Sequence, residues 1–292
     1  MQIQKSFKGH TPYGKLYLVA TPIGNLDDMT FRAIHTLKEV DWIAAEDTRN
    51  TGLLLKHFEI STKQISFHEH NAKEKIPDLI GLLKQGQNLA QVSDAGMPSI
   101  SDPGHDMVKA AIEEDIAVVT VPGASAGISA LIASGLAPQP HIFYGFLPRK
   151  SGQQKQFFES KKDYPETQIF YESPHRVADT LENMLVVYGD RSVVLVRELT
   201  KIYEEYQRGQ ITDLLESISQ TPLKGECLLI VEGASQEVED KDEEDLFSEI
   251  QERIQQGIKK NQAIKEVAKI YQCNKSQLYA AYHEWEEKQA NN

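Results

Sequence analysis

The stretch of this chain that most restricts its fold runs from Gln91 to Gly104. An apolar segment that ends at Val92 opens into a loop that holds two Asp, two Gly and two Pro residues. Glycine permits backbone conformations that other residues avoid, and proline fixes the turns between them. A stiff loop with few large side chains after a strand is typical of the ligand-binding edge of an open α/β sheet. An ordinary strand-to-helix connection is the alternative for this loop taken alone.

Two further loops have the same character. One runs from Leu18 to Leu26 and the other from Val118 to Gly127, and in each an apolar strand leads into Pro, Gly and other small residues. None of the three loops fits a nucleotide-binding signature, since the glycine fingerprint and the Lys-Ser/Thr ending of a phosphate loop are missing. Three such loops predict a ligand that is held by backbone groups and by shape rather than by charge.

The composition is that of a globular protein, with 40% hydrophobic and 25% charged residues in a chain of 292, long enough for two domains. No apolar stretch could span a bilayer and no signal peptide is evident, so we expect a cytoplasmic protein without a membrane segment. Cys227 and Cys273 lack metal-ligand spacing, and we expect both thiols to be reduced.

Charge does not decide the partner. A net charge of −12 weakly disfavours a nucleic acid, whose phosphates need Lys and Arg on the contact surface. Part of that charge belongs to an acidic run at 237–245, which is typical of a solvated linker. Basic residues form local groups elsewhere, at Arg149-Lys150, Lys161-Lys162 and His175-Arg176.

Strand and helix patterns alternate along the chain. In the first half we expect strands at 15–20, 41–45, 64–67, 88–92 and 116–121, and helices near 28–38, 48–56, 72–84, 105–113 and 124–134. This alternation predicts a mostly parallel sheet with helices on both faces. In the second half we expect a mixed sheet with strands at 142–146, 168–171, 193–197, 203–208 and 228–231, and helices near 151–161, 174–187 and 209–218.

A short helical tail follows the acidic run. Apolar residues recur at helical spacing over 249–257, 262–271 and 275–286. The tight turn before the last helix has Ser276 as a plausible N-cap, and the last two helices resemble a helix-turn-helix pair. A small packing or dimerisation subdomain is the first interpretation of this tail, and contact with nucleic acid is the alternative.

Charged residues cluster at the ends of several expected strands. The group 46–50 is most simply a helix cap provided by Asp47 or Thr48. His68 and His70 have no third ligand nearby, so we predict no metal site. The group 197–205 could position a polar substrate across a cleft, or it could be an exposed ladder of ion pairs.

Eight motifs, taken in order, resemble those of the small-subunit ribosomal RNA methyltransferase I family of the tetrapyrrole-methylase superfamily. They are Val19–Leu26, Ala45–Arg49, Ser93–Gly104, Pro122–Ala126, Gly145–Lys150, Tyr171–Arg176, Arg197–Lys201 and Lys224–Glu226. Each motif alone is modest, but eight in order are highly specific. The helical tail is similar to the family's C-terminal helix-turn-helix piece.

The resemblance implies an α/β fold of two domains, 13–126 and 127–234, with a cofactor cleft between them and a helical tail at 246–290. It implies that a homodimer binds S-adenosylmethionine and methylates the ribose 2′-hydroxyl of a cytidine in the decoding region of small-subunit (16S) ribosomal RNA. The RNA would be free or part of an assembled small subunit.

The resemblance also assigns the cofactor site residue by residue. The cofactor would contact Pro22, Ile23 and Gly24 in the first loop, Asp94, Ala95, Gly96 and Ile100 in the second, and Ser125 and Ala126 in the third. Tyr171 would line the pocket from the second domain.

A ribose hydroxyl is a poor nucleophile at neutral pH, so a base or a cation that stabilises the developing alkoxide should help. Lys201 is the first candidate, through its charge or, with a depressed pKa, as a base. Glu46 and Glu198 are the alternatives. Three arginines would hold RNA phosphates or orient those carboxylates: Arg49, Arg176 and Arg197.

Tetrapyrrole methylases typically have Gly-Asp-Pro where this chain has Gly96-Met97-Pro98, with the acidic residue earlier, at Asp94. This is the form of the RNA methylases and favours RNA over a porphyrinoid. A methyltransferase for a tetrapyrrole-like or protein substrate is the alternative, and it predicts an apolar cleft as wide as a macrocycle. A non-catalytic ribosome-binding protein is the third possibility, and it predicts that deleting 236–292 abolishes all interaction.

Overall fold

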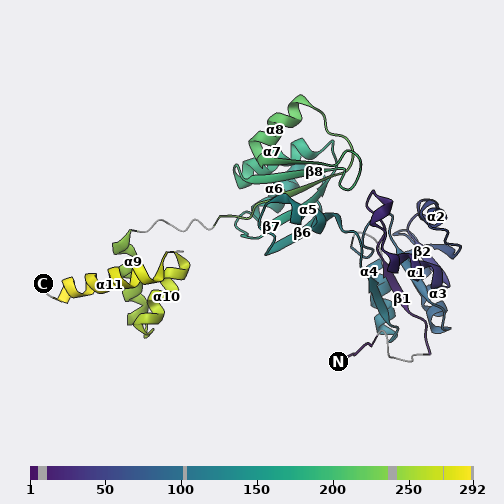
Figure 1. The fold of residues 1–292 in the computed structure, drawn as a ribbon, viewed down its shortest axis with the longest axis horizontal. Helices are drawn as coiled ribbons and strands as arrows, with labels where there is room; N and C mark the ends of the chain where they lie inside the picture. Colours follow the sequence, from purple (N-terminus) through teal and green to yellow (C-terminus); the bar gives the residue numbers. More distant parts are fainter. Residues whose placement is uncertain (6–11, 101–103, 236–241, 272, 291–292) are drawn as a thin grey trace. The chain divides into compact units, whose positions relative to one another are not determined.

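The computed structural model describes residues 1–5, 12–100, 104–235, 242–271 and 273–290, and it is drawn in Figure 1. The chain divides into two compact units, Met1–Gly233 and Ala234–Asn292. The first unit contains two five-stranded sheets, and the described part of the second consists of helices. In the described residues, no helix combines the length and the apolar character that crossing a membrane requires.

The first sheet is entirely parallel, as the alternation of elements predicts. Its order is β3-β2-β4-β1-β5, from β1 (Leu16–Val19), β2 (Trp42–Ala45), β3 (Lys63–Ser66), β4 (Leu89–Val92) and β5 (Val118–Val121). One face packs on α1 (Phe31–Glu39) and α2 (Thr48–His57), and the other on α3 (Ala72–Lys84) and α4 (Gly104–Glu113). Because all the strands run the same way, every loop after a strand lies at the same edge of this sheet.

The second sheet is mixed. Its order is β6-β7-β10-β8-β9, from β6 (His141–Phe146), β7 (Thr167–Glu172), β8 (Ser192–Arg197), β9 (Glu205–Gln210) and β10 (Cys227–Val231). One face packs on α5 (Ala126–Ser134), and the other on α6 (Ser151–Glu159), α7 (Val177–Tyr188) and α8 (Ile211–Gln220). The α/β fold class predicted from the sequence is confirmed.

The direction of the strands gathers four loops at one edge of the second sheet. β6 is parallel to β7, and β10 is antiparallel to both β7 and β8, so β6, β7 and β8 run the same way. The loops that follow these three strands therefore lie at the same edge as the loop that precedes β10. This edge holds residues 147–150, 173–176, 198–204 and 221–226.

The second unit packs α9 (Glu243–Gln255), α10 (Lys260–Ile270) and α11 (Lys275–Ala290) around one apolar core. The rings of Phe247, Tyr282 and Trp285 contact one another in this core. Three helices are predicted for the tail, at 249–257, 262–271 and 275–286, and the structure has three at these places with bounds that differ by up to six residues.

The starts predicted for α9 and α7 and the N-cap predicted for α11 are wrong. α9 begins inside the acidic run expected to be a linker, because acidic residues at 243–245 stabilise the positive end of a helix and Asp242 caps it. The rest of that run, at 237–241, lies outside the described residues. Asn274 rather than Ser276 caps α11, since its side-chain oxygen accepts from two backbone N–H groups. α7 begins at Val177, after a turn over 174–176.

Candidate functional site

The three small-residue loops meet at the carboxyl edge of the first sheet. Thr21 and Gly96 form an antiparallel bridge with N···O distances of 3.0 and 3.1 Å. The Thr21 hydroxyl also donates to the Ser93 carbonyl oxygen at 3.1 Å. A Cβ atom added to Gly96 would lie 3.3 Å from the Ile23 side chain and 3.5 Å from the Ala124 carbonyl oxygen. Backbone contacts therefore hold the loops together, as loops of small residues allow.

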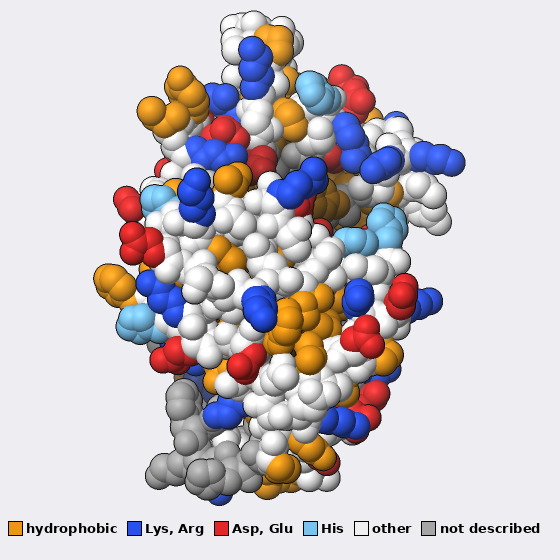
Figure 2. Space-filling model, turned by 90° about the vertical axis from the view of Figure 1, so that its right-hand side faces the viewer, with side chains coloured by type: hydrophobic (Ala, Val, Ile, Leu, Met, Phe, Trp, Pro, Cys, Tyr) orange, Lys and Arg blue, Asp and Glu red, His pale blue; other side chains and the backbone are white. Residues whose placement is uncertain are grey.

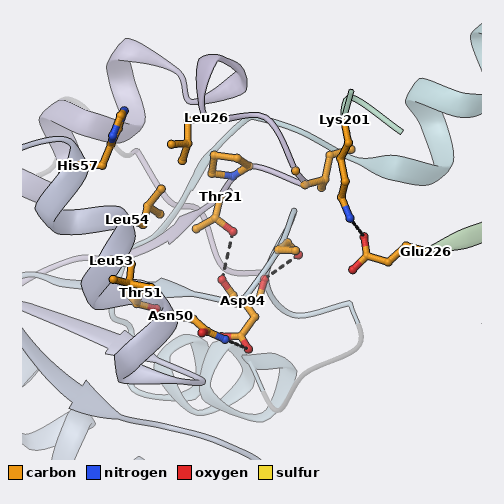
Figure 3. A pocket seen from close by; sticks show the side chains of 15 residues that line it. Thr21, Leu26, Asn50, Thr51, Leu53, Leu54, His57, Asp94, Lys201 and Glu226 are labelled. Atoms are coloured by element: carbon orange, nitrogen blue, oxygen red, sulfur yellow. Dashed lines mark hydrogen bonds and ion pairs between the residues drawn. The ribbon is translucent and has the colours of Figure 1, made fainter. Parts of the chain in front are cut away.

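A pocket of about 380 Å³ opens beside these loops, within the size range of small-molecule sites. Figure 3 shows its wall from α2, with Asn50 and His57 at the two ends of that wall, and the side chains of Lys201 and Glu226 on the opposite side. The loops after β1 and β4 complete the lining. The first sheet thus supplies most of this pocket, and the second sheet contributes a cation and a carboxylate.

Half of the residues predicted to contact the cofactor line this pocket: Pro22, Ile23, Gly24, Asp94 and Ala95. Gly96 lies in the bridge to Thr21, and Ser125 is the N-cap of α5, whose first residue is Ala126. Ile100 is exposed. Tyr171 has a hydrogen bond with the Gly127 backbone, and burial raises the pKa of its hydroxyl.

Asp94 presents a fixed negative charge to the pocket. One of its carboxylate oxygens accepts from the Asp47 backbone N–H at 3.2 Å, and the other accepts from the Asn50 amide at 3.1 Å. Both donors belong to the start of α2, so the carboxylate is held by a rigid element. A carboxylate in this position suits a ligand that carries positive charge.

Lys201 lies between two carboxylates at the mouth of the pocket. Its Nζ is 3.0 Å from Glu198 Oε1 and 3.0 Å from Glu226 Oε2. The backbone N–H of Glu226 donates to Glu198 Oε1 at 2.9 Å, which closes the cluster. Lys201 and Glu198 are candidates from the sequence, and the structure brings them together.

Glu226 is a residue of the site that the sequence motifs include without assigning it a role. It lies 25 positions from Lys201 along the chain, so no local spacing connects the two. The antiparallel pairing of β8 and β10 places Cys227 opposite Arg197, and this register puts Glu226 opposite Glu198. Glu226 could have been predicted as a site residue only if the antiparallel pairing of β8 and β10 had been inferred from the sequence.

The loop that carries Lys201 is held in a strained conformation. Glu198 and Thr200 have φ angles of 51° and 67°, a region that costs a residue other than glycine about 1 to 3 kcal/mol. Three hydrogen bonds hold the loop: Glu198 N–H to Glu226 O, Lys201 N–H to Glu198 O, and Thr200 N–H to the Glu204 carboxylate. The surrounding contacts therefore fix where Lys201 points.

The cluster keeps Lys201 charged. Burial lowers the pKa of Lys201, but hydrogen bonds to Glu226 and Glu198 and their charges outweigh it, and the pKa is raised overall. The pKa of Glu198 is lowered, first by the Glu226 backbone N–H and then by Lys201. Of the two roles considered for Lys201, the surroundings favour the charge and not the base.

We predict that Lys201 stays charged between about pH 6 and about pH 9, so its ionisation should not change kcat over this range. The contribution of Glu198 is lost only as pH falls through its pKa, which lies below the ordinary 4.5. That of Lys201 is lost only as pH rises through its pKa, above the ordinary 10.5. Rates measured for the wild type and Lys201→Arg should show the same dependence on pH. A rising limb that Lys201→Arg lacks would identify Lys201 as a base instead.

Each of the three candidate arginines has an acidic neighbour. Arg49 is exposed and pairs with Asp47 at 2.8 Å, and its hydrogen bonds lower the Asp47 pKa to about 2. Arg197 pairs with Glu205, with 3.0 Å between Nε and Oε2. Arg176 lies 3.3 Å from Glu172 and donates to the Pro148 carbonyl oxygen at 2.7 Å. Glu46, at the end of β2, is not among the described residues that line the pocket.

The three basic groups lie at different edges of the second sheet. Arg149-Lys150 and His175-Arg176 follow β6 and β7, at the edge that also carries Lys201. Lys161-Lys162 precede β7 and lie at the opposite edge.

On the face shown in Figure 2, cationic and acidic side chains are interspersed. Among the residues that the structure describes, no three His, Cys, Asp or Glu side chains are grouped as metal ligands.

The loops at this edge of the second sheet are anchored by a buried carboxylate. The Glu172 side chain has no exposed area, and it accepts from the Ser173 backbone N–H at 2.8 Å and from the Thr180 hydroxyl at 2.9 Å. Its ion pair with Arg176 connects it to Pro148 in the neighbouring loop. Glu172 thus links the loop after β6 to the loop after β7.

We predict that Glu172→Ala lowers the free energy of unfolding by about 3 kcal/mol, because it leaves a cation and two donors without their partner. Urea unfolding followed by circular dichroism measures the change. Glu114→Ala is the control, since Glu114 forms an exposed ion pair with Lys84 and should cost less than about 1 kcal/mol. Equal effects of the two substitutions would contradict the anchoring role of Glu172.

Comparison with known proteins connects this architecture to a family. Residues 15–215 match the family model described as Tetrapyrrole (Corrin/Porphyrin) Methylases. A solved structure described as uroporphyrin-III C-methyl transferase from Thermus thermophilus complexed with S-adenyl homocysteine superposes with a TM-score of 0.52 at 18% identity. The superposition covers 75% of this chain and 97% of that one, and at this identity it shows the fold alone.

Two relatives carry the same name, ribosomal RNA small subunit methyltransferase I. The protein of Streptococcus pyogenes serotype M1 is 72% identical over 286 residues, which cover 97% of this chain and 100% of the relative. The protein of Bacillus subtilis (strain 168) is 47% identical over 285 residues, which cover 96% and 98%. These matches confirm the resemblance seen in the motifs. The chain is a methyltransferase, and it belongs to the ribosomal RNA small subunit methyltransferase I family within the tetrapyrrole methylases.

Proposed function

We propose that this protein uses S-adenosylmethionine to methylate the ribose 2′-hydroxyl of a cytidine in the decoding region of small-subunit ribosomal RNA, in the cytoplasm. The observation that carries the proposal is the ammonium group of Lys201, held by Glu198 and Glu226 at the mouth of a pocket built from small-residue loops. The names of the relatives supply the substrate class, since both specify ribosomal RNA of the small subunit.

The residues at the pocket fit S-adenosylmethionine. When bound, it supplies an electrophilic methyl group on a positively charged sulfur. The Asp94 carboxylate would hold the positively charged ligand, and the loop 22–24 would enclose it. We propose that Gly96, Ile100, Ser125, Ala126 and Tyr171 complete this site. The related fold whose description includes S-adenyl homocysteine, the demethylated form of this cofactor, supports the choice.

The residues at the mouth of the pocket suit transfer to a hydroxyl. As the hydroxyl gives its proton to solvent water and attacks, negative charge would develop on its oxygen, and a fixed cation stabilises this charge more than it stabilises the neutral hydroxyl. Lys201 is such a cation, and its side chain is 27% exposed, so water screens it only in part. Glu198 and Glu226 hold its position.

We also propose that the protein is a homodimer. Ile128 and Ile132 lie one turn apart on α5 and are 46% and 75% exposed, while the other face of this helix packs on the second sheet. Exposed apolar stripes of this kind mark contact surfaces. Sedimentation equilibrium measures the mass directly, and a monomer at micromolar concentration would contradict the proposal.

Transfer of labelled methyl from S-adenosylmethionine tests the function. Four acceptors are compared: small ribosomal subunits that lack their methylations, free small-subunit RNA, large subunits, and uroporphyrinogen III. We expect label only in the first two, with the difference between them showing which form is the substrate. Label in uroporphyrinogen III with none in RNA would overturn the proposal.

A further inference from the structure

A second pocket lies next to the Lys201 cluster. It has a volume of about 300 Å³, and it is lined by Arg197, Glu198, Tyr203, Lys224 and Gly225. Glu198 lies at the boundary between the two pockets, because it lines the second one and contacts Lys201, which lines the first. The ion pair between Glu198 and Lys201 therefore connects the linings of the two pockets.

The lining of the second pocket combines an aromatic ring with a cation that has no partner among the described residues. Tyr203 is 69% exposed, and the preceding Ile202 is 90% exposed. Neither Tyr203 nor Lys224 has a hydrogen bond, ion pair or ring contact with any residue in the ranges that the structure describes. Single exposed apolar residues are common, but here a free ring and a free ammonium group line one pocket.

The loop that carries Tyr203 is rigid enough to present it. Tyr203 lies two positions after Lys201, in the loop held by the left-handed residues Glu198 and Thr200. The Glu204 N–H donates to the Lys201 carbonyl oxygen at 3.1 Å, and the Glu204 carboxylate accepts from the Thr200 N–H at 2.6 Å. These contacts join residue 204 to residues 200 and 201, so the backbone on both sides of Tyr203 is held, and its position is coupled to that of Lys201.

Gly225 keeps this pocket and the cluster together. Its φ angle is 86°, and a Cβ atom there would lie 2.4 Å from Glu198 Oε1. The chain therefore turns closely over the Glu198 carboxylate, between the cation of Lys224 and the carboxylate of Glu226. Lys224 and Glu226 consequently flank one tight turn, with Lys224 lining the second pocket and Glu226 the first.

We infer that the second pocket is the subsite for the acceptor nucleotide of single-stranded RNA, with the base stacked on Tyr203 and a phosphate held by Lys224. An aromatic ring beside a cation is the usual surface for an unpaired nucleotide, because every base has a face that stacks and every linkage carries negative charge. The inference rests on the proposed function, and it gives Tyr203 and Lys224 a role in substrate binding that the sequence motifs do not assign to either residue.

Steady-state methylation of small ribosomal subunits tests the subsite, together with filter binding of the same subunits. We expect Tyr203→Ala to raise the KM for subunits and their Kd about tenfold or more, and Tyr203→Phe to stay near the wild type, because the ring and not the hydroxyl stacks. Lys224→Ala should raise both constants and lower the slope of log Kd against log salt by about one. The Kd for S-adenosylmethionine, measured by calorimetry, should not change.

Tyr164→Ala and Lys162→Ala are the controls. Both residues precede β7, at the opposite edge of the same sheet, and neither substitution should change the KM for subunits. An unchanged KM and Kd for Tyr203→Ala would overturn the subsite, and so would an equal loss of cofactor affinity. If the wild-type protein binds subunits without methylating them, the proposed function is wrong but the subsite can still be tested. Filter binding of the Tyr203→Ala variant then shows whether Tyr203 contacts the RNA. A wild type that does not bind subunits refutes both.

Discussion

Lys201→Ala is expected to lower kcat for methyl transfer by about 10²- to 10³-fold, the usual effect of removing one group that stabilises a developing oxyanion. The substitution removes the ammonium group at the mouth of the pocket and leaves Glu198 and Glu226 without their shared cation. Two carboxylates near a developing negative charge would add repulsion to the loss of stabilisation. The Kd for S-adenosylmethionine should change little, because Asp94 and the loops that we assign to the cofactor are untouched.

Two further variants show whether the loss of activity in Lys201→Ala comes from the loss of its charge. Lys201→Arg keeps the charge with a different shape, so it should retain more activity than Lys201→Ala. Lys84→Ala removes an exposed lysine of an ion pair with Glu114 in the first sheet's helices, and it should behave as the wild type. A kcat for Lys201→Ala within about threefold of the control would remove Lys201 from the mechanism.

Gly24→Ala is expected to lower kcat by about 10²-fold without unfolding the protein. A Cβ atom at this position would lie 2.6 Å from Cγ and 2.7 Å from Cε of Lys201, and the φ angle of 150° is one that side chains rarely adopt. The lysine must then leave its place between the two carboxylates. A displacement of about 1 Å at a reacting centre can cost this much in rate.

Gly152→Ala is the matched control for Gly24→Ala. An added Cβ atom at Gly152 meets nothing within 4 Å, so activity and stability should be those of the wild type. Circular dichroism and thermal unfolding of Gly24→Ala separate a local displacement from a loss of fold. Full activity in a folded Gly24→Ala protein would show that the position of Lys201 is not critical.

The sequence predicts the elements of the first sheet well because their signals are local. Four of its five strands are short, mostly apolar runs, the exception being β3 with the sequence Lys-Gln-Ile-Ser, and each loop after a strand contains Pro, Gly or charged residues that end it. Asp47, expected as a helix cap, caps α2 through the backbone N–H of Arg49. The three loops that meet at Gly96 follow from the parallel order alone, because parallel strands share an edge.

The parts of the site that depend on long-range pairing are not evident from the sequence. Glu226 reaches Lys201 only through the register of β8 and β10, and Arg176 is anchored by Glu172 and by the Pro148 carbonyl oxygen of another loop. The pKa of Lys201 depends on its contacts with Glu198 and Glu226. The sequence alone therefore does not decide whether Lys201 acts as a base or as a cation. The division at residue 126 into two α/β domains stays a proposal, supported by the packing of α5 on the second sheet.

The position of the transferred methyl group tests the central claim most directly. Small subunits methylated by the enzyme are digested to nucleosides, and the labelled nucleoside is identified by mass spectrometry and by resistance of its linkage to alkali. A cation at the mouth of the pocket predicts label on the ribose oxygen, as 2′-O-methylcytidine, because that oxygen is where negative charge develops. Label on a carbon or nitrogen of the base would contradict the role assigned to Lys201.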